Sequence, residues 1–512
     1  MATTSSSTTT IGHFIDGQKT AGTSGRSQAV MNPATGAEQA QVALASADEV
    51  NNAIAVAAAA QPEWAAFNHQ KRIRVINKWM NLILENMDEI ATTLSLEHGK
   101  VFEDAKGDIT RGTDVLEFAL GAPHHLKGEY SRGVGTGIDT YSLRQPLGVV
   151  AAISPFNFPA MIPLWQVGPA LSAGNAVILK PSERDPSVPI RLAELFIEAG
   201  GPAGVLNVVN GDKEAVDALL DSPTIKAVGF VGSTPIAKSI YEHAARTNKR
   251  AQCFGGAKNH CIILPDADLD QAADALIGAA YGSAGERCMA ISVAVPVGKQ
   301  TADQLREKIT EKLASLKVGH PLDPDADYGP LVAQSALDRV TDYIQKGVDA
   351  GAELVVDGRT SGATDSEFNG ESLDGGYFIG PTLFDHVTKD NPVYAEEIFG
   401  PVLVIARAET LEEAIDLPSS HEYGNGVSIF TNNGAAAQKF VEDVEVGMVG
   451  VNIPIPVPIA YYTFGGWKAS GFGDLNQHGP DAYRFFTKTK TVTSRWPKEQ
   501  AEGASFVMPI MD

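Results

Sequence analysis

The sequence predicts an α/β fold with two α/β domains, and three observations support this prediction. The chain has 512 residues, which is too long for one ordinary hydrophobic core. From residue 147 onward, short apolar runs alternate with stretches of helical periodicity, and the same alternation resumes after Cys261. Such a pattern indicates β-α-β units on parallel sheets. Ligands on such sheets collect at the carboxyl ends of the strands.

The elements of the first domain follow from these patterns. Apolar periodicity in an Ala-rich segment predicts two helices between residues 48 and 84, and a further helix at 104–120. The predicted strands are 147–153, 176–179, 205–209 and 227–231, and the helices between them are 189–198 and 214–220. Residues 130–143 are rich in Gly and Thr and alternate like a strand. They fit a protruding hairpin and an ordinary long loop equally well.

The second domain shows the same rhythm. Its predicted helices include 302–316 and 336–347, and its predicted strands include 402–405 and 427–430. No tandem repeat, heptad pattern or long block of like charge interrupts it.

Composition excludes several classes of function. Forty Lys and Arg against sixty-two Asp and Glu give a net charge of −22, which disfavours binding to nucleic acid, including an RNA-binding scaffold, and to anionic membranes. The most apolar region, 147–165, is interrupted by three prolines, so no membrane span is expected. Residues 2–10 are rich in Ser and Thr and lack the features of a secretory or transit signal, and we expect a frayed tail. Three cysteines suit a reducing cytoplasm better than a disulfide framework.

One cysteine is a candidate nucleophile. Cys288 follows Arg287 in Gly282-Ser283-Ala284-Gly285-Glu286-Arg287-Cys288, and a neighbouring cation favours the reactive thiolate. A buried structural cysteine is an equally good interpretation of this segment alone. For Cys253 and Cys261, which lie in apolar strand-like contexts, burial is the better interpretation.

Three loops at strand ends are candidate ligand sites. Asn157 follows the first strand, where its amide could stabilise an oxyanion or serve a turn. Lys180 and Glu183 follow the next strand, where they could bind an adenosine ribose and favour NAD over NADP, or form a solvated loop. Gly232 and Ser233 open a helix, where a pyrophosphate could bind; such turns are common without a ligand.

Other catalytic classes lack their motifs. No C-x-x-C or H-E-x-x-H suggests a metal site, and we expect no metal; His124 and His125 have no nearby Cys or carboxylate ligand in sequence. No G-x-S-x-G suggests a serine hydrolase.

Taken in order, these segments resemble the aldehyde dehydrogenase superfamily over nearly the whole chain. The matching segments are 154–159, 179–183, 232–234, 285–288, 396–401 and 464–466, and the likeness begins at 14–17. The resemblance implies an aldehyde dehydrogenase-like fold with a Rossmann-like NAD-binding domain (1–125 and 145–256), a catalytic domain (257–456) and a small β flap for oligomerisation (126–144 and 479–496).

The resemblance also implies roles for individual residues. Cys288 would be the nucleophile, and Asn157 with the Cys288 backbone N–H would form the oxyanion hole. The residues implied to contact NAD are Ser154, Phe156, Lys180, Glu183, Arg184, Ser233, Gly255, Glu397 and Phe399.

The chain departs from the hydrolytic members at Phe254. Those members carry a glutamate four residues before the lysine of a glycine-containing segment, and here Phe254 precedes Lys258 by four. Phenylalanine cannot act as a base. Water, with a pKa of ~15.7, needs a base far more than a thiol with a pKa of ~8.5, so this change penalises hydrolysis more than thiolysis.

Four segments narrow the resemblance to the CoA-acylating methylmalonate-semialdehyde dehydrogenases: 256–260, 286–290, 452–458 and 491–496. This resemblance implies methylmalonate or malonate semialdehyde as substrate, coenzyme A as co-substrate, and a part in valine catabolism. Arginine binds a carboxylate with two oxygens at once. Arg287 and Arg111 are therefore the candidates for the substrate carboxylate, with Phe464 beside the substrate; surface ion pairing is the alternative for Arg111.

The expected reaction forms a thioester on Cys288, loses carbon dioxide from the β-carboxylate and passes propionyl or acetyl to CoA. The alternatives are a hydrolytic aldehyde dehydrogenase that gives a free acid, and a catalytically silent binding or structural protein on the same scaffold. A homotetramer or homodimer is expected by resemblance, assembled through 130–143 and the region near 485–492.

Overall fold

The computed structural model describes residues 9–496, and most of the tail expected at residues 2–10 lies outside that range. The last two residues of that tail are not frayed. Thr9 and Thr10 belong to β1 (Thr9–Ile11), which pairs in parallel with β5 (Ala37–Ala43). β-Branched residues such as Thr favour strands, so the low sequence complexity was misleading there. β4 (Ser27–Asn32) completes this three-stranded sheet.

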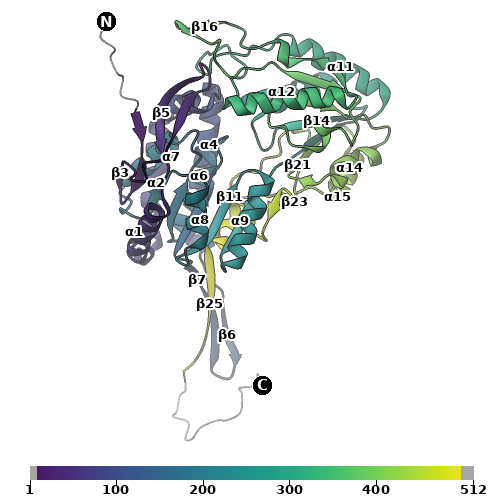
Figure 1. The fold of residues 1–512 in the computed structure, drawn as a ribbon. Helices are drawn as coiled ribbons and strands as arrows, with labels where there is room; N and C mark the ends of the chain where they lie inside the picture. Colours follow the sequence, from purple (N-terminus) through teal and green to yellow (C-terminus); the bar gives the residue numbers. More distant parts are fainter. Residues whose placement is uncertain (1–8, 497–512) are drawn as a thin grey trace, which may run out of the picture.

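An eight-stranded sheet forms the first domain (Figure 1). Its centre consists of five parallel strands, and antiparallel strands lie at both edges. In spatial order the strands are β24 (Gly471–Phe472), β12 (Arg250–Phe254), β11 (Ile225–Val231), β8 (Val149–Ile153), β9 (Ala176–Lys180), β10 (Leu206–Val208), β2 (His13–Ile15) and β3 (Gln18–Thr20). The four strands predicted here are β8 to β11, so the α/β prediction is confirmed.

The apolar run of β8 is explained by burial on both faces. Val149, Ala151 and Ile153 pack into one hydrophobic cluster, whereas Val150 and Ala152 pack into another. Successive side chains of a strand point to opposite faces, and a parallel sheet covered by helices on both sides requires apolar residues at every position.

Helices cover both faces of this sheet. The first cluster contains α1 (Ala47–Ala66), α8 (Lys213–Asp221) and α9 (Thr234–Arg246). The second contains α2 (His69–Glu85), α3 (Met87–His98), α4 (Phe102–Ala119), α6 (Met161–Ser172), α7 (Ser187–Glu198) and α16 (Gly479–Phe485). Every residue of α6 is buried, because α6 lies between the sheet and α4.

A seven-stranded sheet forms the second domain, and the chain passes into it between Phe254 and Asn259. In spatial order its strands are β15 (Glu353–Val356), β18 (Thr382–Asp385), β19 (Val402–Ile405), β14 (Ile291–Pro296), β13 (Asn259–Ile263), β21 (Gly426–Phe430) and β22 (Met448–Val451). All pairs are parallel except β15 with β18. The helices packed with it are α10 (Leu269–Tyr281), α11 (Lys299–Leu313), α12 (Gln334–Asp349), α14 (Leu411–Ser420) and α15 (Gly434–Asp443).

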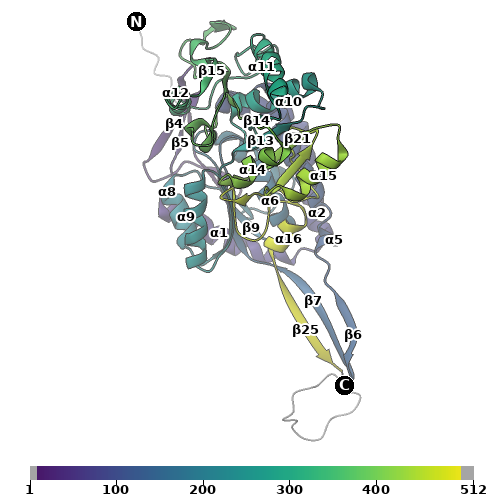
Figure 2. The same ribbon diagram turned by 90° about the vertical axis from the view of Figure 1, so that its right-hand side faces the viewer.

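A three-stranded sheet projects from the body of the molecule as an arm (Figures 1 and 2). β6 (Tyr130–Gly135) and β7 (Ile138–Pro146) form an antiparallel hairpin, which decides between the two interpretations of 130–143. β25 (Thr487–Arg495) pairs antiparallel with the whole of β7. Most side chains of β25 are exposed.

The remaining elements are short: α5 (Ala122–His125), η1 (Gly282–Gly285), η2 (Gly358–Thr360), β16 (Glu367–Phe368), β17 (Glu371–Ser372), α13 (Pro392–Ala395), β20 (Tyr423–Gly424) and β23 (Trp467–Lys468). Among the helices of residues 9–496, none combines the length and the apolar character that crossing a bilayer requires.

Candidate active site

Cys288 lies on a tightly held loop between η1 and β14. Its carbonyl oxygen accepts hydrogen bonds from the side-chain amides of Asn259 (2.9 Å) and Asn425 (3.0 Å). Cys288 is partly exposed, whereas Cys253 and Cys261 are buried. Of the three thiols, Cys288 is therefore the one that a dissolved substrate can reach.

A left-handed turn directs the chain into this loop. Ser283, Ala284 and Gly285 have φ values of 54°, 51° and 73°, a region that costs free energy for residues with a side chain. A Cβ at Gly285 would lie 2.2 Å from the carbonyl oxygen of Gly400. The turn therefore requires glycine at this position.

Arg287 does not activate the neighbouring thiol as the sequence suggested. Burial raises the pKa of Cys288 to about 12, and the nearby Glu397 carboxylate raises it further. The cation that opposes this shift is Lys100. The Arg287 guanidinium instead forms a 2.7 Å ion pair with Asp104 of α4. The prediction of an Arg287-stabilised thiolate is wrong because adjacency in sequence does not fix the direction of a side chain.

Asn157 and Cys288 line the same cavity, which has a volume of about 240 Å³. Its wall comes from both domains: Pro155, Phe156, Asn157, Val231, Gly232, Ser233, Gly255, Cys288, Arg339, Glu397 and Phe399. Asn157 is 3% exposed and lies on the loop after β8. The parallel pairing of β8, β9 and β11 brings their carboxyl ends to one edge, as the sequence predicted.

A second cleft of about 570 Å³ extends along this edge. The sequence-predicted residues that line it are Ser154, Phe156, Lys180, Glu183, Arg184 and Ser233. Lys180 and Glu183 form a 3.3 Å ion pair, and the Arg184 guanidinium lies 5.0 Å from the centre of the Phe156 ring. The cleft shares Phe156, Ser233 and Arg339 with the Cys288 cavity, so one elongated molecule can occupy both.

The start of α9 fits a phosphate group. Ser233 is the N-cap residue of α9, and its side chain makes no capping hydrogen bond. The free N–H groups of a helix N-terminus and its dipole attract anions. This position beside Lys180 and Glu183 fits the pyrophosphate and ribose of NAD.

Glu397 is half-buried and lies opposite the β12–β13 junction. One of its carboxylate oxygens, Oε1, accepts a 2.8 Å hydrogen bond from the backbone N–H of Ala257, and burial raises its pKa. A Cβ at Gly256 would lie 2.6 Å from Oε2 of Glu397. Phe399, with φ of 58°, packs edge-on against Phe156 at 5.9 Å between ring centres. This segment therefore joins the two domains at the cavity.

Phe254 is the last residue of β12 and is 5% exposed. Its ring meets Phe464 at 6.3 Å, and Phe464 in turn meets Trp165 at 5.3 Å. Phe464 belongs to a hydrophobic cluster against which Cys288 packs. The aromatic rings of Phe464, Trp165 and Phe254 therefore give Cys288 an apolar neighbourhood on the side of this cluster.

The two arginines suggested for a substrate carboxylate both involve α4. Arg111, on α4, donates a 2.8 Å hydrogen bond to the carbonyl oxygen of Pro458 and lies 3.5 Å from Asp114. Arg287 meets Asp104, which is seven residues before Arg111 and thus about 10 Å away along the helix. The two guanidinium groups are therefore held apart, each beside its own acidic neighbour.

The sequence interpretation missed several residues of this site. Arg339 lines the cavity and donates to the carbonyl oxygen of Ile398 at 3.2 Å. Burial lowers the pKa of Lys258 to about 7, and its Nζ lies 2.8 Å from the carbonyl oxygen of Glu396. Arg339 lies in no recognised motif, and the glycine-containing segment marks Lys258 without showing its partner, because the contacts of both residues are with segments far away in sequence.

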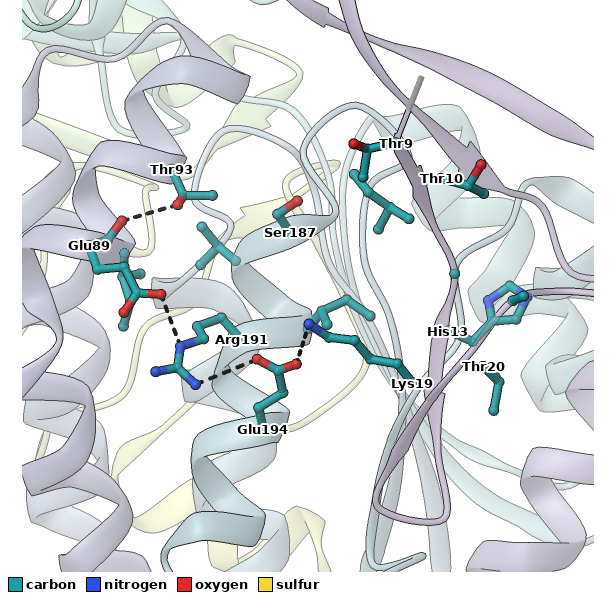
Figure 3. A pocket seen from close by; sticks show the side chains of 16 residues that line it. Thr9, Thr10, His13, Lys19, Thr20, Glu89, Thr93, Ser187, Arg191 and Glu194 are labelled. Carbon is teal, nitrogen blue, oxygen red and sulfur yellow. Dashed lines mark hydrogen bonds and ion pairs between the residues drawn. The ribbon is translucent and has the colours of Figure 1, made fainter. Parts of the chain in front are cut away.

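A further cavity lies elsewhere in the protein. A groove of about 670 Å³ runs between the N-terminal strands and helices α3 and α7, and Figure 3 shows Arg191 between Glu89 and Glu194, with Lys19 on Glu194. Its charged groups are already paired, and it shares no residue with the Cys288 cavity.

One group of side chains has the composition of a metal site, Glu353, Asp385 and His386. Asp385 already accepts hydrogen bonds from the Arg407 guanidinium at 3.0 and 2.7 Å and from Arg306 at 3.2 Å. We interpret this group as part of an ion-pair network.

Comparison with known proteins agrees with this geometry. A family model described as "Aldehyde dehydrogenase family" matches residues 20–492. A malonate-semialdehyde dehydrogenase of Pseudomonas aeruginosa is 53% identical over 98% of this chain and 100% of its own length. One of Halalkalibacterium halodurans is 43% identical over 94% and 98%.

Solved structures agree as well. A putative methylmalonate-semialdehyde dehydrogenase of Sinorhizobium meliloti in complex with NAD is 60% identical, with a TM-score of 0.94 over 96% of this chain and 99% of that one. The methylmalonate-semialdehyde dehydrogenase of Oceanimonas doudoroffii is 52% identical, with a TM-score of 0.93 and the same coverage.

Proposed function

Because this chain belongs to the aldehyde dehydrogenase family, we propose that it oxidises malonate or methylmalonate semialdehyde and transfers the acyl group to coenzyme A. The observation that carries the proposal is the joint placement of Cys288, Asn157 and Glu397 around one cavity, with Phe254 at the position of the hydrolytic glutamate. The names of the relatives supply the substrate class.

The first step is attack by Cys288. Its sulfur bonds to the aldehyde carbon, and the resulting oxyanion accepts hydrogen bonds from the Asn157 side chain and the Cys288 backbone N–H. Donors fixed in advance stabilise such a charge because they need no reorganisation. When bound, NAD supplies the hydride acceptor that converts this adduct into a thioester. Ser154, Phe156, Lys180, Glu183, Arg184, Ser233, Gly255, Glu397 and Phe399 would hold it.

The thioester then loses carbon dioxide and passes to CoA. The thioester carbonyl accepts the electron pair of the breaking C–C bond, and a proton on that carbon completes acetyl or propionyl. The CoA thiolate attacks the carbonyl, and the bond to Cys288 breaks as its thiolate leaves. Phe254 offers no base to water, so thiolysis is favoured over hydrolysis.

The carboxylate of the substrate needs a cation near Cys288. Arg287 and Arg111 are our candidates, since a guanidinium binds two carboxylate oxygens at once. Phe464 would pack beside the carbon chain. Asp104 and Asp114 hold the two arginines in the described structure, and each pair would yield to the substrate.

We also infer the assembly, the cellular compartment and the pathway of the enzyme. The exposed arm of β6, β7 and β25 is suited to pair with other subunits in a homotetramer or homodimer. Three free cysteines are compatible with the reducing cytoplasm. Methylmalonate semialdehyde as substrate would give the enzyme a part in valine catabolism.

The decisive assay combines both semialdehydes with NAD, with and without CoA, and identifies the acyl product by mass spectrometry. We expect acetyl-CoA or propionyl-CoA and carbon dioxide in equal amounts to NADH. Free acid formed at the same rate in either condition would contradict CoA acylation and favour the hydrolytic alternative. Cys288→Ala should abolish NADH formation; full activity in that variant would refute the proposed mechanism.

A further inference from the structure

A buried ion pair lies beneath the loop that carries Asn157. Lys100 and Asp108 are 3.1 Å apart, and neither side chain is exposed to solvent. The Lys100 ammonium also donates a 2.8 Å hydrogen bond to the Asn157 carbonyl oxygen, and it lies 4.0 Å from the centre of the Phe158 ring. Burying two charges is costly unless further hydrogen bonds satisfy them, and here both ions have such partners.

The pair holds the loop at two points. Lys100 binds the carbonyl of Asn157, and Asp108 accepts a 2.6 Å hydrogen bond from the backbone N–H of Met161 through its second oxygen. The residues between these anchors include Pro159, which has no N–H to donate. The conformation of the loop that carries Asn157 therefore depends on the side chains of Lys100 and Asp108, which lie outside this loop.

The chain delivers Lys100 to this position by a sharp turn. Helix α3 ends at Gly99, whose φ of 95° is left-handed, and α4 starts at Phe102. A Cβ on Gly99 would lie 2.9 Å from the carbonyl oxygen of Pro330. This turn points Lys100 into the protein, and Asp108 follows two turns later on α4.

Lys100 also has an electrostatic effect on the nucleophile. It is the cation that lowers the pKa of Cys288 against burial and Glu397. The other charged or titratable groups around it are Asp104 and Asp108 on α4, His98 on α3 and Glu286 on the Cys288 loop. Burial lowers the pKa of His98, which makes it neutral, and raises the pKa of Glu286 to about 8. Arg287 is engaged by Asp104.

We propose that Lys100 is a positioning residue: it fixes the loop of Asn157 through the 2.8 Å hydrogen bond and places a positive charge behind the cavity that Asn157 shares with Cys288, while its partner Asp108 offsets that charge. This inference rests on the proposed role of Cys288 as nucleophile. Lys100 touches neither of the two clefts assigned to substrate and cofactor. It acts through Asn157 and through its charge.

Two substitutions separate charge from structural support. Lys100→Met and Asp108→Asn both break the same ion pair, but they remove charges of opposite sign. At about pH 8, we expect the iodoacetamide alkylation of Cys288 in the free enzyme to slow at least about threefold in Lys100→Met, and to accelerate by about twofold in Asp108→Asn. Peptide mass spectrometry identifies the alkylated cysteine, and both variants should melt at a lower temperature than the parent.

Lys106→Met is the matched control. Lys106 is on α4, as Asp108 is. It pairs with Asp88 at 2.9 Å and lies 4.6 Å from the centre of the Phe102 ring, but at the surface. The alkylation rate of Cys288 in Lys106→Met should equal that in the parent. If Lys100→Met does not fold, Lys100→Gln replaces it, since the amide keeps one donor and loses the charge.

The inference is overturned if the alkylation rate changes in the same direction in Lys100→Met and Asp108→Asn, or changes in neither. Both variants lose the same structural support, so only the opposite charges that they remove can move the rate in opposite directions. The proposed function fails in a different experiment. If Cys288→Ala still forms NADH, Cys288 is not the nucleophile, whatever the alkylation rates of the Lys100 and Asp108 variants.

Discussion

At the scale of single residues, Cys288 shows how apolar surroundings change the reactivity of a thiol. Cys288 packs against a hydrophobic cluster, and an acidic neighbour, Glu397, lies close to it. Both features favour the neutral thiol. The free protein therefore holds Cys288 mainly as the neutral thiol. In the proposed reaction, the positive charges of the substrate site and of bound NAD would favour its ionisation.

The pH dependence of the free enzyme follows from this. With the pKa of Cys288 raised to about 12, its thiolate fraction increases about tenfold per pH unit below that value. We expect the alkylation rate of Cys288 to increase nearly tenfold from about pH 7 to about pH 8, and again to about pH 9. A plateau in this range would show a lower pKa and contradict the described setting.

Phe254 should decide between water and CoA. In Phe254→Glu, a carboxylate near the thioester can act as general base, which typically contributes 10²–10⁴-fold. We expect this variant to release free acid without CoA at least about tenfold faster than the parent, at some cost in stability because the site is buried. Phe254→Leu is the control for loss of the ring. Equal free-acid rates in the two variants would contradict a role of this position in partitioning.

At the scale of elements, the left-handed turn of η1 has a sequence requirement that can be measured. Gly285→Ala places a Cβ against the carbonyl of Gly400 at a φ of 73°. We expect a lower melting temperature and at least about a tenfold loss of NADH formation, because the loop that holds Cys288 must move. Initial rates and thermal melts of the purified variant check both.

Gly278→Ala provides the comparison on the neighbouring helix. Nothing lies within 4 Å of a Cβ at this exposed position of α10, so alanine should stabilise the protein by about 0.5–1 kcal/mol and keep its activity. Equal losses in both variants would show that the turn has no special need for glycine.

The regular elements could be predicted from sequence because their periodicity reports local burial. The run 147–153 became β8, and 336–347 became the middle of α12. β1 was missed because a Ser- and Thr-rich tail has no apolar pattern, and its pairing with β5 is not local. The hairpin at 130–146 stayed ambiguous, since an exposed two-stranded element buries too little to impose a pattern.

The site could be predicted less completely than the fold. Cys288 and Asn157 were candidates from their local sequence, the resemblance supplied their implied roles and added Glu397, and the structure brings all three to one cavity. The direction of Arg287 and the partners of Lys100 were not predictable. The first depends on a contact with α4, and the second on contacts of the turn between α3 and α4 with a loop far along the chain. Buried charges follow from tertiary pairing, which local sequence does not record.

At the scale of the whole molecule, the arm should control assembly. A chain ending at Phe486 lacks β25 and leaves β7 with one unpaired edge. From the particle mass in light scattering, divided by the mass of the truncated chain, we expect fewer subunits per particle than in the parent, because the proposed subunit contact uses this sheet. A chain ending at Trp496 retains β25 and should keep the parental number of subunits. The same number of subunits in both truncations would contradict the role of the arm.

The pairing of β25 with β7 also determines when the arm can be completed during synthesis on the ribosome. Pro146 pairs with Thr487, so 487 − 146 = 341 residues must be added before β7 finds its second neighbour. At ~5–20 residues per second, that interval is roughly 20–70 s. Each nascent chain therefore has an incomplete arm until translation is nearly over. If the arm forms the proposed subunit contact, both domains have been synthesised before two subunits can associate through the complete sheet.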